Sequence, residues 1–441
     1  MRQTGGPRAA AMPGRAAPGR SYADKATILG GAFGNLVEWY DWTIFGLLSG
    51  IFAPQIIPAN NPATSLIGVL ITFAIGFLAR PVGSLVLSPM ADRYGRRRML
   101  ALTIILMGVG SLIVALTPPF SQIGVLAPIL LLVARLIQGF STGGEFQGSA
   151  VFLAEHAPPH RRALGSSGQM MSIGLAILLA TGTAALTTAL IPQPALARWG
   201  WRLPFLFGAV LSMYGFYVRA KLPETPAFET VRQRHEIASH PLLSALRQYP
   251  RESLFVFVIQ ASTVQFYLWT VFLPTYARLV GGLPIAEGLL GSTIALAVYT
   301  AAIPVFAAIS DRIGRKPLLY LGATGFLVLT WPLLLLLRTG GFGTYLLVDI
   351  AGILLIASSN SVLAPVLCEL FPTRVRTSGI GLPYAVCSAV LGGTAPLIAT
   401  ALITSHRDWG VAVYVMAICL VTCVTFRFMP ETRGRSLEVA D

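Results

Sequence analysis

The chain has 441 residues, of which 54% are hydrophobic and only 11% are charged. Soluble proteins carry about 25% charged residues, so this composition and a mean hydropathy of +0.70 exclude a soluble protein and indicate an integral membrane protein. The net charge of +14 does not indicate a nucleic-acid partner, because the basic residues lie in short segments between apolar runs, where they report membrane topology.

Apolar runs long enough to cross a bilayer as helices, about 20 residues each, recur twelve times along the chain. Residues 1–24, rich in Gly, Ala, Pro and Arg, are predicted to form a disordered cytoplasmic tail. We expect an N-terminal six-helix bundle at 25–220, a cytoplasmic linker at 221–251, a C-terminal six-helix bundle at 252–429 and a cytoplasmic tail at 430–441. The predicted spans are 26–52, 64–89, 99–117, 125–150, 163–190, 201–220, 252–279, 287–309, 317–337, 343–368, 375–403 and 410–429.

Lys and Arg concentrate in alternate loops between these spans. The intervening loops hold little beyond Arg198, Arg338 and Arg407. The positive-inside rule therefore predicts a multi-pass protein of the inner (plasma) membrane with both termini in the cytoplasm. The basic loops contain Arg93, Arg96, Arg97, Arg98, Arg161, Arg162, Arg232, Arg234, Arg247, Arg312, Arg315, Lys316, Arg374 and Arg376.

The first span carries three polar side chains near its centre, Asn35, Glu38 and Asp41. Their spacing of i, i+3 and i+6 places all three on one broad helix face. A charge at the bilayer centre costs roughly 2.5–3.5 kcal/mol on insertion scales, so such groups face protein or water. We therefore expect this face to line the central cavity of a membrane carrier.

Two loops repeat one pattern, Asp-Arg-x-Gly-Arg, after the second and the eighth spans. Glycine permits a tight turn between antiparallel helices, and an Asp–Arg pair beside it can form in one conformation and break in another. Pro-Glu-Thr also ends both halves, at 223–225 and 430–432. These repeats predict an all-α integral membrane fold of twelve transmembrane helices in two pseudo-symmetric six-helix bundles. The predicted conformational gate is Asp92, Arg93, Gly95, Arg96, Asp311, Arg312, Gly314 and Arg315.

The repeated loop resembles the signature loop of the major facilitator superfamily over about residues 25–440, although Ser88 and Ala307 stand where that signature begins with Gly. Four further segments are together similar to its metabolite–proton symporter branch, which includes carriers of α-ketoglutarate, citrate, shikimate and proline or betaine. The fifth span lacks the Gly-Pro-rich pattern of drug–proton antiporters, which favours symport. The four segments are 35–41, 76–83, 138–146 and 199–205.

Proton coupling is expected mainly in the first half. Glu38 and Asp41 are the first candidates, because a carboxylate that loses an arginine partner to an anionic substrate can take up a proton; either one could instead pair structurally. Arg135 resembles the buried arginine that this superfamily often ties to proton coupling, with a structural role as the alternative. Glu145 is a fourth candidate, although a structural pair is favoured for it.

Arg80, deep in the second span, is either an anion clamp for the substrate or a partner for Glu38 or Asp41. Together with Arg80, the predicted substrate-binding residues are Asn35, Tyr40, Gln265 and Tyr267. The expected function is alternating-access, proton-coupled uptake of a small organic acid such as a di- or tricarboxylate. The alternative is symport of a zwitterionic osmolyte such as proline or betaine.

An enzyme is not expected, because the sequence contains no nucleophile–base constellation, metal-ligand spacing or phosphate-binding loop. No cofactor and no metal are predicted. The expected partners are a small-molecule substrate, protons and the lipid bilayer, and the protein is expected to be a monomer.

Overall fold

The computed structural model of the protein describes residues 25–59 and 61–437, and these residues form helices and connecting loops without a strand. Within this described part of the chain, eleven helical segments are long and apolar enough to cross a membrane. A twelfth long helix, α1 (Lys25–Ile56), contains the polar residues Asn35, Glu38 and Asp41. The predicted twelve-helix membrane fold is confirmed. The predicted tail at 1–24, and the last four residues of the tail predicted at 430–441, lie outside the described residues.

The first half of the chain contains six long helices and several short ones. Their bounds are α1 (Lys25–Ile56), α2 (Pro62–Tyr94), α3 (Arg96–Leu116), α4 (Phe120–Ile123), α5 (Leu126–His156), η1 (Pro159–Arg161), α6 (Arg162–Ser166), α7 (Gly168–Leu190), α8 (Gln193–Ala195), η2 (Leu196–Gly200) and α9 (Arg202–Ala220). The segment 221–251, predicted to be a cytoplasmic linker, contains two short helices, α10 (Pro226–Gln233) and α11 (Pro241–Gln248).

The second half is more interrupted. Its elements are α12 (Pro250–Gln260), α13 (Thr263–Tyr267), η3 (Leu268–Phe272), α14 (Leu273–Gly281), α15 (Ile285–Ile313), α16 (Lys316–Leu336), η4 (Leu337–Thr339), α17 (Phe342–Asn360), α18 (Leu363–Glu369), η5 (Thr373–Val375), α19 (Arg376–Cys387), η6 (Ser388–Gly392), α20 (Ala395–Thr404) and α21 (Trp409–Phe428).

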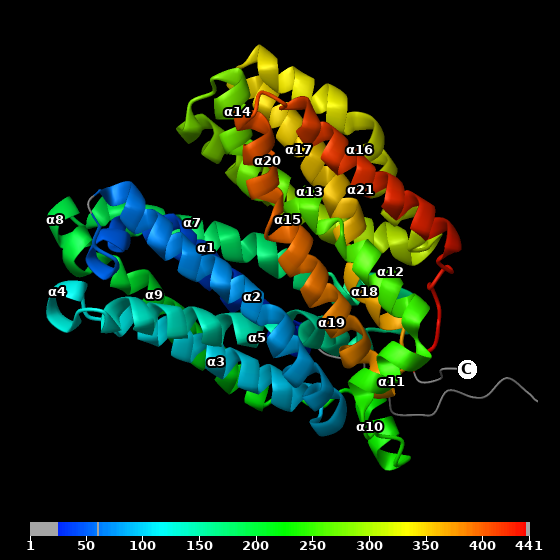
Figure 1. The fold of residues 1–441 in the computed structure, drawn as a ribbon. Helices are drawn as coiled ribbons and strands as arrows, with labels where there is room; N and C mark the ends of the chain where they lie inside the picture. The colour runs from blue at the N-terminus through cyan, green and yellow to red at the C-terminus, as the bar shows by residue number, and fades with distance from the viewer. Residues whose placement is uncertain (1–24, 60, 438–441) are drawn as a thin grey trace, which may run out of the picture.

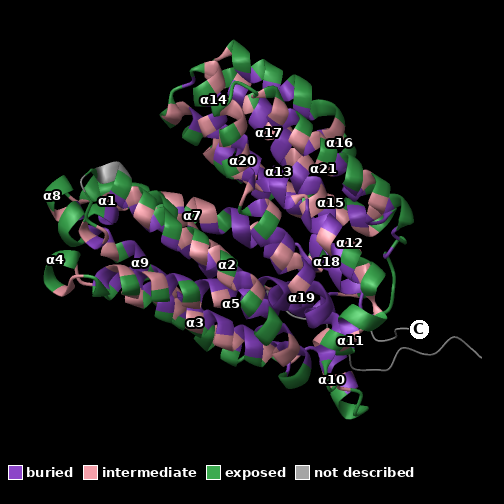
Figure 2. Ribbon diagram, in the orientation of Figure 1, coloured by how far each residue is buried: buried purple, intermediate pink, exposed green. Residues whose placement is uncertain are grey.

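The helices gather into two lobes that meet at one end and diverge at the other (Figure 1). One lobe consists of α1, α2, α3, α5, α7 and α9, and the other of α12 to α21. Contacts of α2 with α19, α7 with α15 and α5 with α18 join the lobes. Buried residues are densest where α5, α18 and α19 meet (Figure 2). The molecule is therefore closed at one end and open at the other.

Small residues let α2 and α5 approach closely within the first lobe. A Cβ atom on Gly83 would meet the Phe140 carbonyl, and one on Gly139 would meet the Gly76 carbonyl. Close backbone approach through small residues is a common way for membrane helices to associate. This contact holds Arg80, between Gly76 and Gly83 on α2, against α5.

Two membrane segments of the second lobe contain a π-helical turn at mid-length. The turn η3 interrupts the segment from Pro250 to Gly281, and η6 interrupts the segment from Thr373 to Thr404. Such turns interrupt the regular hydrogen-bond ladder of the helix and are frequent at functional sites. Tyr267 immediately precedes η3, and Ser388 begins η6.

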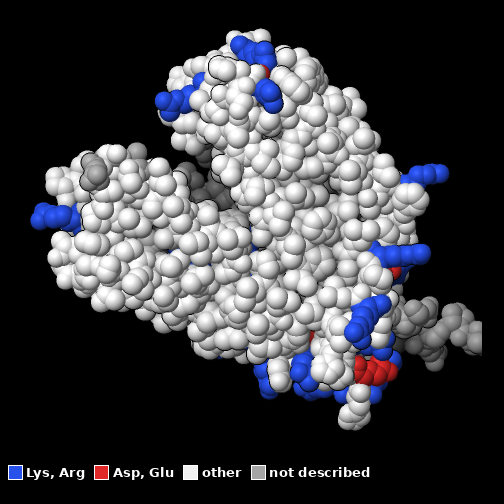
Figure 3. All heavy atoms as spheres, in the orientation of Figure 1, with Lys and Arg blue, Asp and Glu red and all other residues white. Residues whose placement is uncertain are grey.

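The flanks of both lobes are apolar, and charge gathers at the closed end, near the C-terminus, with a few basic side chains at the opposite tips (Figure 3). Exposed leucine, valine and phenylalanine side chains cover the flanks, as expected for surfaces that face lipid. The charged end contains the basic loops of the sequence analysis, so we expect it to face the cytoplasm.

Cysteine accessibility tests this orientation. Gln233 on α10 and Ala59 after α1 are both exposed and lie at opposite ends of the membrane segments. A membrane-impermeant thiol reagent added outside sealed cells should label Ala59→Cys and leave Gln233→Cys unlabelled until the cells are opened. Cells without an introduced cysteine give the background from the four native cysteines, three of them buried. External labelling of Gln233→Cys in sealed cells would contradict the orientation.

Candidate functional site

Arg80 lies on α2, is largely buried, and contacts residues of both lobes. Its guanidinium carbon is 3.9 Å from the ring centroid of Phe77 and 4.7 Å from that of Trp42, both from the first lobe. Tyr267 from the second lobe is within hydrogen-bonding reach of the same guanidinium. An arginine held over aromatic faces keeps its planar fork of donors oriented toward an incoming anion.

Glu38 faces Arg80 from α1. Its side chain is 3% exposed and is hydrogen-bonded to the Thr142 hydroxyl of α5. Arg80 exerts the strongest effect of any charged group on it, yet the two do not form an ion pair in the described structure. Oε2 of Glu38 has no hydrogen-bond partner among the described residues. A buried carboxylate oxygen without a donor is unusual and marks this group as one that can change its partner or its protonation.

Aromatic rings from both lobes surround this Arg–Glu pair. Trp39 stacks on Tyr267 with ring centroids 6.5 Å apart, and Phe77 meets Tyr267 edge-on at 6.3 Å. Phe146 stacks on Tyr384 at 4.1 Å, and Tyr384 lies within electrostatic range of Arg80 and Glu38. The arrangement can hold an anionic group at Arg80 and an apolar or cationic group against the rings. We refer to Glu38, Arg80, Trp39, Phe77, Phe146, Tyr267 and Tyr384 as the central site.

Asp41, one turn further along α1, lies in a different environment. Its carboxylate is 3.3 Å from the Arg135 guanidinium, accepts a hydrogen bond from Ser111 and another from Gln138, and is completely buried. Arg135 lies 3.9 Å from the ring centroid of Phe45. Asp41 and Arg135 therefore form an ion pair inside the first lobe.

Glu145 is also paired within the first lobe, as the sequence analysis favoured. Arg219 of α9 donates to its two oxygens at 2.8 and 2.5 Å, and the Thr103 hydroxyl donates at 2.6 Å. Arg219 also donates to the carbonyls of Leu100 and Gly31. Both side chains are buried, so Arg219 ties α9 to α1, α3 and α5.

Three of the predicted substrate-binding residues lie away from the central site. Asn35 donates to the Gln169 carbonyl and to the Ser172 hydroxyl of α7. Tyr40 donates to the Pro204 carbonyl and is fully buried in the first lobe. Gln265 donates to Cys419 Sγ and lines a cavity within the second lobe, between α12, α16, α17 and α21. The structure thus brings together Glu38, Arg80 and Tyr267 from the predicted set.

A layer of ion pairs closes the junction of the lobes at the charged end. Asp92, at the end of α2, lies 3.1 Å from Arg96 and accepts hydrogen bonds from the backbone N–H groups of Thr377 and Ser378 on α19. Glu155 of α5 lies 3.6 Å from Arg96 and also pairs with Arg376 of α19. Arg93 is exposed. Asp92, Arg96, Glu155 and Arg376 thus bind the first lobe to the second.

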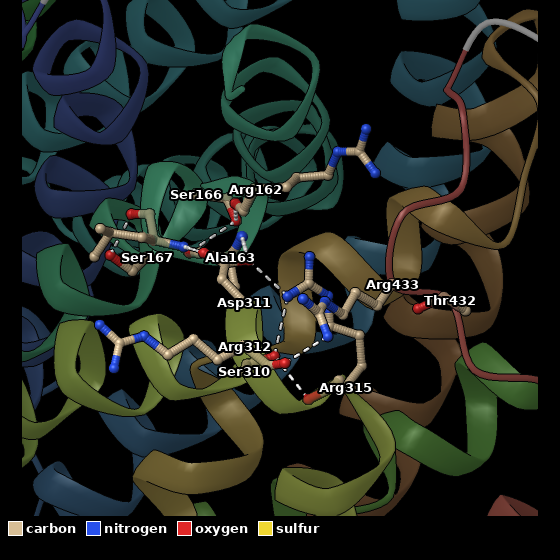
Figure 4. A network of polar contacts seen from close by, with 12 residues as sticks. Arg162, Ala163, Ser166, Ser167, Ser310, Asp311, Arg312, Arg315, Thr432 and Arg433 are labelled. Carbon is tan, nitrogen blue, oxygen red and sulfur yellow. Dashed lines mark hydrogen bonds and ion pairs between the residues drawn. The ribbon is translucent and has the colours of Figure 1, made fainter. Parts of the chain in front are cut away.

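A second layer repeats this arrangement with the lobes exchanged (Figure 4). Asp311, at the end of α15, lies 2.7 Å from Arg315 and accepts hydrogen bonds from the backbone N–H groups of Ala163 and Leu164 in the first lobe. Glu369 of α18 pairs with Arg315 at 3.3 Å and with Arg162 at 2.7 Å. Each aspartate therefore contacts backbone donors of the opposite lobe.

The two signature glycines turn the chain into the next helix with positive φ values, 104° at Gly95 and 109° at Gly314. A glutamate of each Pro-Glu-Thr repeat caps that helix: Glu224 accepts from the Arg96 N–H at 3.0 Å, and Glu431 from the Arg315 N–H at 2.9 Å. Burial raises the pKa of Glu224. Glu431 is less buried, and backbone N–H donors outweigh the effect of burial and lower its pKa.

The described part of the C-terminal segment crosses both layers. The Arg435 carbonyl accepts a hydrogen bond from Arg162 at 2.9 Å, and the Leu437 carbonyl accepts one from Arg376 at 2.8 Å. Arg162 and Arg376 are equivalent residues of the two layers. The segment therefore ties the two layers together in this conformation.

Sequence reasoning missed the partners of these groups. Glu155, Glu369 and Arg219 were not singled out, and Arg162 and Arg376 entered only as basic loop residues. A signal was present for four of them: Glu155 precedes Arg162 by seven residues, and Glu369 precedes Arg376 by the same interval. The replacement of signature glycine by Ser88 is accommodated, since Ser88 accepts from Gln147 at 2.9 Å and packs closely against Gly381.

Comparison with known proteins identifies what this arrangement is similar to. The family model of the Major Facilitator Superfamily matches residues 31–393 and, in a second match, 288–440. The citrate–proton symporter of Klebsiella pneumoniae is 35% identical over 89% of this chain and 90% of its own length. The glycine betaine/proline/ectoine/pipecolic acid transporter OusA of Dickeya dadantii is 32% identical over 94% of this chain and 85% of its own length.

Among solved structures, the proton:xylose symporter XylE of E. coli, bound to 6-bromo-6-deoxy-D-glucose, has the same fold. The TM-score is 0.77 over 94% of this chain and 97% of that chain, at 19% identity.

The ion-pair layers give a prediction. In Asp92→Asn or Asp311→Asn, charge-assisted hydrogen bonds worth about 1.5–3 kcal/mol each are weakened, so the lobes should separate more often at the charged end. Spin labels at the exposed positions Arg98 and Arg374, one in each half, report this separation. In either variant, the measured distribution of distances between the two labels should gain a longer component. Glu229→Gln, which breaks only the exposed Glu229–Arg232 pair, is the control and should leave it unchanged. Identical distributions in all variants would contradict a gating role.

Proposed function

This chain belongs to the major facilitator superfamily, in its metabolite–proton symporter branch, and from that premise we propose that it takes up a small organic acid whose carboxylate binds Arg80. It is a proton-coupled secondary transporter and a multi-pass inner-membrane protein, not an enzyme. The observation that carries the proposal is the state of Arg80, a buried arginine in contact with both lobes that has no carboxylate in ion-pair contact among the described residues.

The other deep arginines of the first lobe already have carboxylate partners. Arg135 pairs with Asp41, and Arg219 pairs with Glu145. Each pair is buried inside the lobe, where removal of one partner would leave an uncompensated charge. Arg80 is different because its guanidinium lies between aromatic rings and one tyrosine hydroxyl. Its geometry suits a bidentate contact with a substrate carboxylate.

We assign the coupled proton to Glu38. Burial disfavours the ionised form of Glu38, and the positive charge of an unoccupied Arg80 opposes that effect. A substrate carboxylate at Arg80 neutralises that charge and places a second negative group nearby, so Glu38 then binds a proton. In the loaded site the charge of Arg80 cancels that of the substrate carboxylate, and protonated Glu38 is neutral. Apart from the substrate's other groups, the site then has no net charge, so the loaded carrier can reorient within the membrane at a lower cost. Asp41, Arg135 and Glu145 support this site by fixing α1, α5 and α9.

Alternating access follows from the same arrangement. The ion-pair layers hold the lobes together at the charged end while the central site is open to the other side. Reorientation requires both layers to break, and the π-helical turns at η3 and η6 provide places where the second lobe can bend. We propose that binding of substrate and proton favours this step.

A zwitterionic osmolyte is the second candidate, and the composition of the central site favours it over a tricarboxylate. One arginine matches one carboxylate, whereas a tricarboxylate would bring two charges for which the described central site has no further cation. The rings of Trp39, Phe77, Tyr267 and Tyr384 could bind a quaternary ammonium group. The charge and the shape of the site thus favour a substrate with one carboxylate.

A neutral substitution at Glu38 tests the coupling. Glu38→Gln keeps the size of the side chain but cannot release a proton. In vesicles it should therefore retain counterflow exchange and lose accumulation driven by a pH gradient. Exchange needs only reorientation of the loaded carrier, whereas accumulation needs proton release inside. Accumulation with a normal pH dependence in this variant would contradict the assignment.

Asp41→Asn is the matched comparison on the same helix. It leaves Arg135 buried without its carboxylate, which typically destabilises a protein by about 3–5 kcal/mol. We expect a lower melting temperature of the purified protein and less folded protein in the membrane, with coupling intact in the fraction that folds. Loss of coupling in a fully stable Asp41→Asn protein would instead place the proton at Asp41.

Two isosteric ligands separate the substrate candidates. Glycine betaine and 3,3-dimethylbutyrate have the same shape and one carboxylate each, and differ in having nitrogen or carbon at the centre of the trimethyl group. Either should raise the melting temperature of the protein by mass action, and citrate should do so less. A cation–π contribution of about 0.5–2 kcal/mol would favour betaine by roughly 2- to 30-fold in affinity. Stabilisation by citrate alone would contradict the single-carboxylate argument.

Arg80→Lys is the control for the site itself. A point-like ammonium cannot reproduce the planar fork, so every ligand that binds through its carboxylate should lose at least tenfold in affinity. A ligand that binds this variant normally does not use Arg80.

A further inference from the structure

Asp349 is a buried acid in the second lobe that transport through the central site does not use. It lies in the second turn of α17 and is 1% exposed. The Ser292 hydroxyl of α15 donates to its Oδ2 at 2.8 Å, and the Tyr345 hydroxyl lies 2.7 Å from Ser292 Oγ. Asp349 and Tyr345 lie in the first half of α17 and Ser292 near the start of α15, at the opposite end of these elements from the ion-pair layer formed by Asp311 and Glu369.

No arginine, lysine or histidine of the described residues forms an ion pair with Asp349. This distinguishes it from the other buried acids of the membrane segments. Asp41, Asp92, Glu145, Glu155 and Glu369 each form an ion pair with an arginine. Glu38 has Arg80 within electrostatic range. The hydroxyls at Asp349 supply hydrogen bonds but no charge.

The elements packed around Asp349 supply no counter-charge either. On α14, Tyr276 is buried and Arg278 is exposed; on α15, Glu287 is partly buried and lies more than a turn before Ser292. On η4, Arg338 is exposed and pairs with Asp408. Tyr345 is the only titratable group described in contact with Asp349.

The packing around the acid is tight. A Cβ atom on Gly291 would meet the Tyr345 ring at 2.6 Å, and one on Gly352 would meet the Trp269 indole. Glycines therefore let α15 and η3 approach α17 on both sides of Asp349. An ionised carboxylate in this interface would be a buried charge without a counter-ion, which is strongly unfavourable, whereas the neutral acid needs only hydrogen bonds.

We propose that Asp349 is a second proton-binding site of this transporter, located in the second lobe and loaded from the side to which the lobes are open. The proton comes from water and forms an O–H bond on the carboxylate; on release it returns to water. Ser292 is half-buried and connects the acid to the edge of the interface. The protonated acid keeps α15 and α17 packed as they are here, and release of the proton requires water to enter between them.

Infrared difference spectroscopy of the full-length protein in vesicles tests the site directly, without knowledge of the substrate. A protonated carboxylic acid has a carbonyl stretch that an ionised one lacks. At neutral pH, wild type should show one protonated-carboxyl band that Asp349→Asn lacks, and the band should disappear reversibly as the pH is raised. Asp408→Asn is the matched control, since Asp408 lies at the same end of the same lobe but pairs with Arg338.

Ser292→Ala gives an independent measurement if Asp349→Asn does not fold. Loss of a hydroxyl donor removes a bond that stabilises the ionised form, so the wild-type band should persist to a pH about one unit higher. Identical spectra for wild type and Asp349→Asn would overturn the proposal. A band that never titrates while the protein stays folded would also overturn it, because it would indicate a permanent hydrogen-bond donor. Neither outcome bears on Glu38 or on the substrate at Arg80.

Discussion

The cost of burying charge in a membrane protein determines how the polar residues of this chain are arranged. A buried carboxylate or guanidinium without a partner is strongly destabilising, and lipid offers no water to compensate. Arg135 with Asp41 and Arg219 with Glu145 satisfy this constraint inside the first lobe, where they also fix the helix positions. Because most buried charges are satisfied in this way, Glu38 and Asp349 stand out as carboxyl groups whose protonation can change.

The repeat of the two halves of the chain explains why there are two equivalent ion-pair layers. The central site has no such duplicate. Asp92 and Asp311 each accept backbone hydrogen bonds from the opposite lobe, so both contacts must break before the lobes can separate at that end. In the proposed function the central site needs one anion contact, which we assign to Arg80 of the first lobe. Tyr267 and Tyr384, both adjacent to or near π-helical turns, complete the site from the second lobe. Symmetry is kept where the two lobes bind each other and is lost at the proposed substrate site.

Hydropathy and spacing predicted the membrane spans and the repeat, and the motifs predicted the family by resemblance, because each is read from short stretches of the chain. Glu38, Arg80 and Tyr267 were among the predicted site residues, and it is the packing of the helices that places these three together. Sequence patterns could not separate Glu38 from Asp41 or predict that Tyr40 donates to Pro204, since neighbouring faces of α1 meet different helices. Pairing depends on segments far apart in sequence: Glu145 and Arg219 are 74 residues apart. Only the packing of α9 and α5 against the same two helices, α1 and α3, shows that Arg219 completes that pair.

The contrast between Glu38 and Asp41 shows how proton binding can become coupled to substrate binding when a buried acid has no arginine of its own. The two acids lie one turn apart on α1, yet Asp41 has an arginine and two further donors, whereas Glu38 keeps one oxygen without a partner. A third arginine dedicated to Glu38 would stabilise the lobe and hold that carboxylate permanently ionised. Arg80 instead serves Glu38 only at a distance, so a substrate carboxylate can compete for it. Under the proposed mechanism, the incomplete satisfaction of one buried acid is therefore what makes the binding of a proton and of a substrate carboxylate depend on each other.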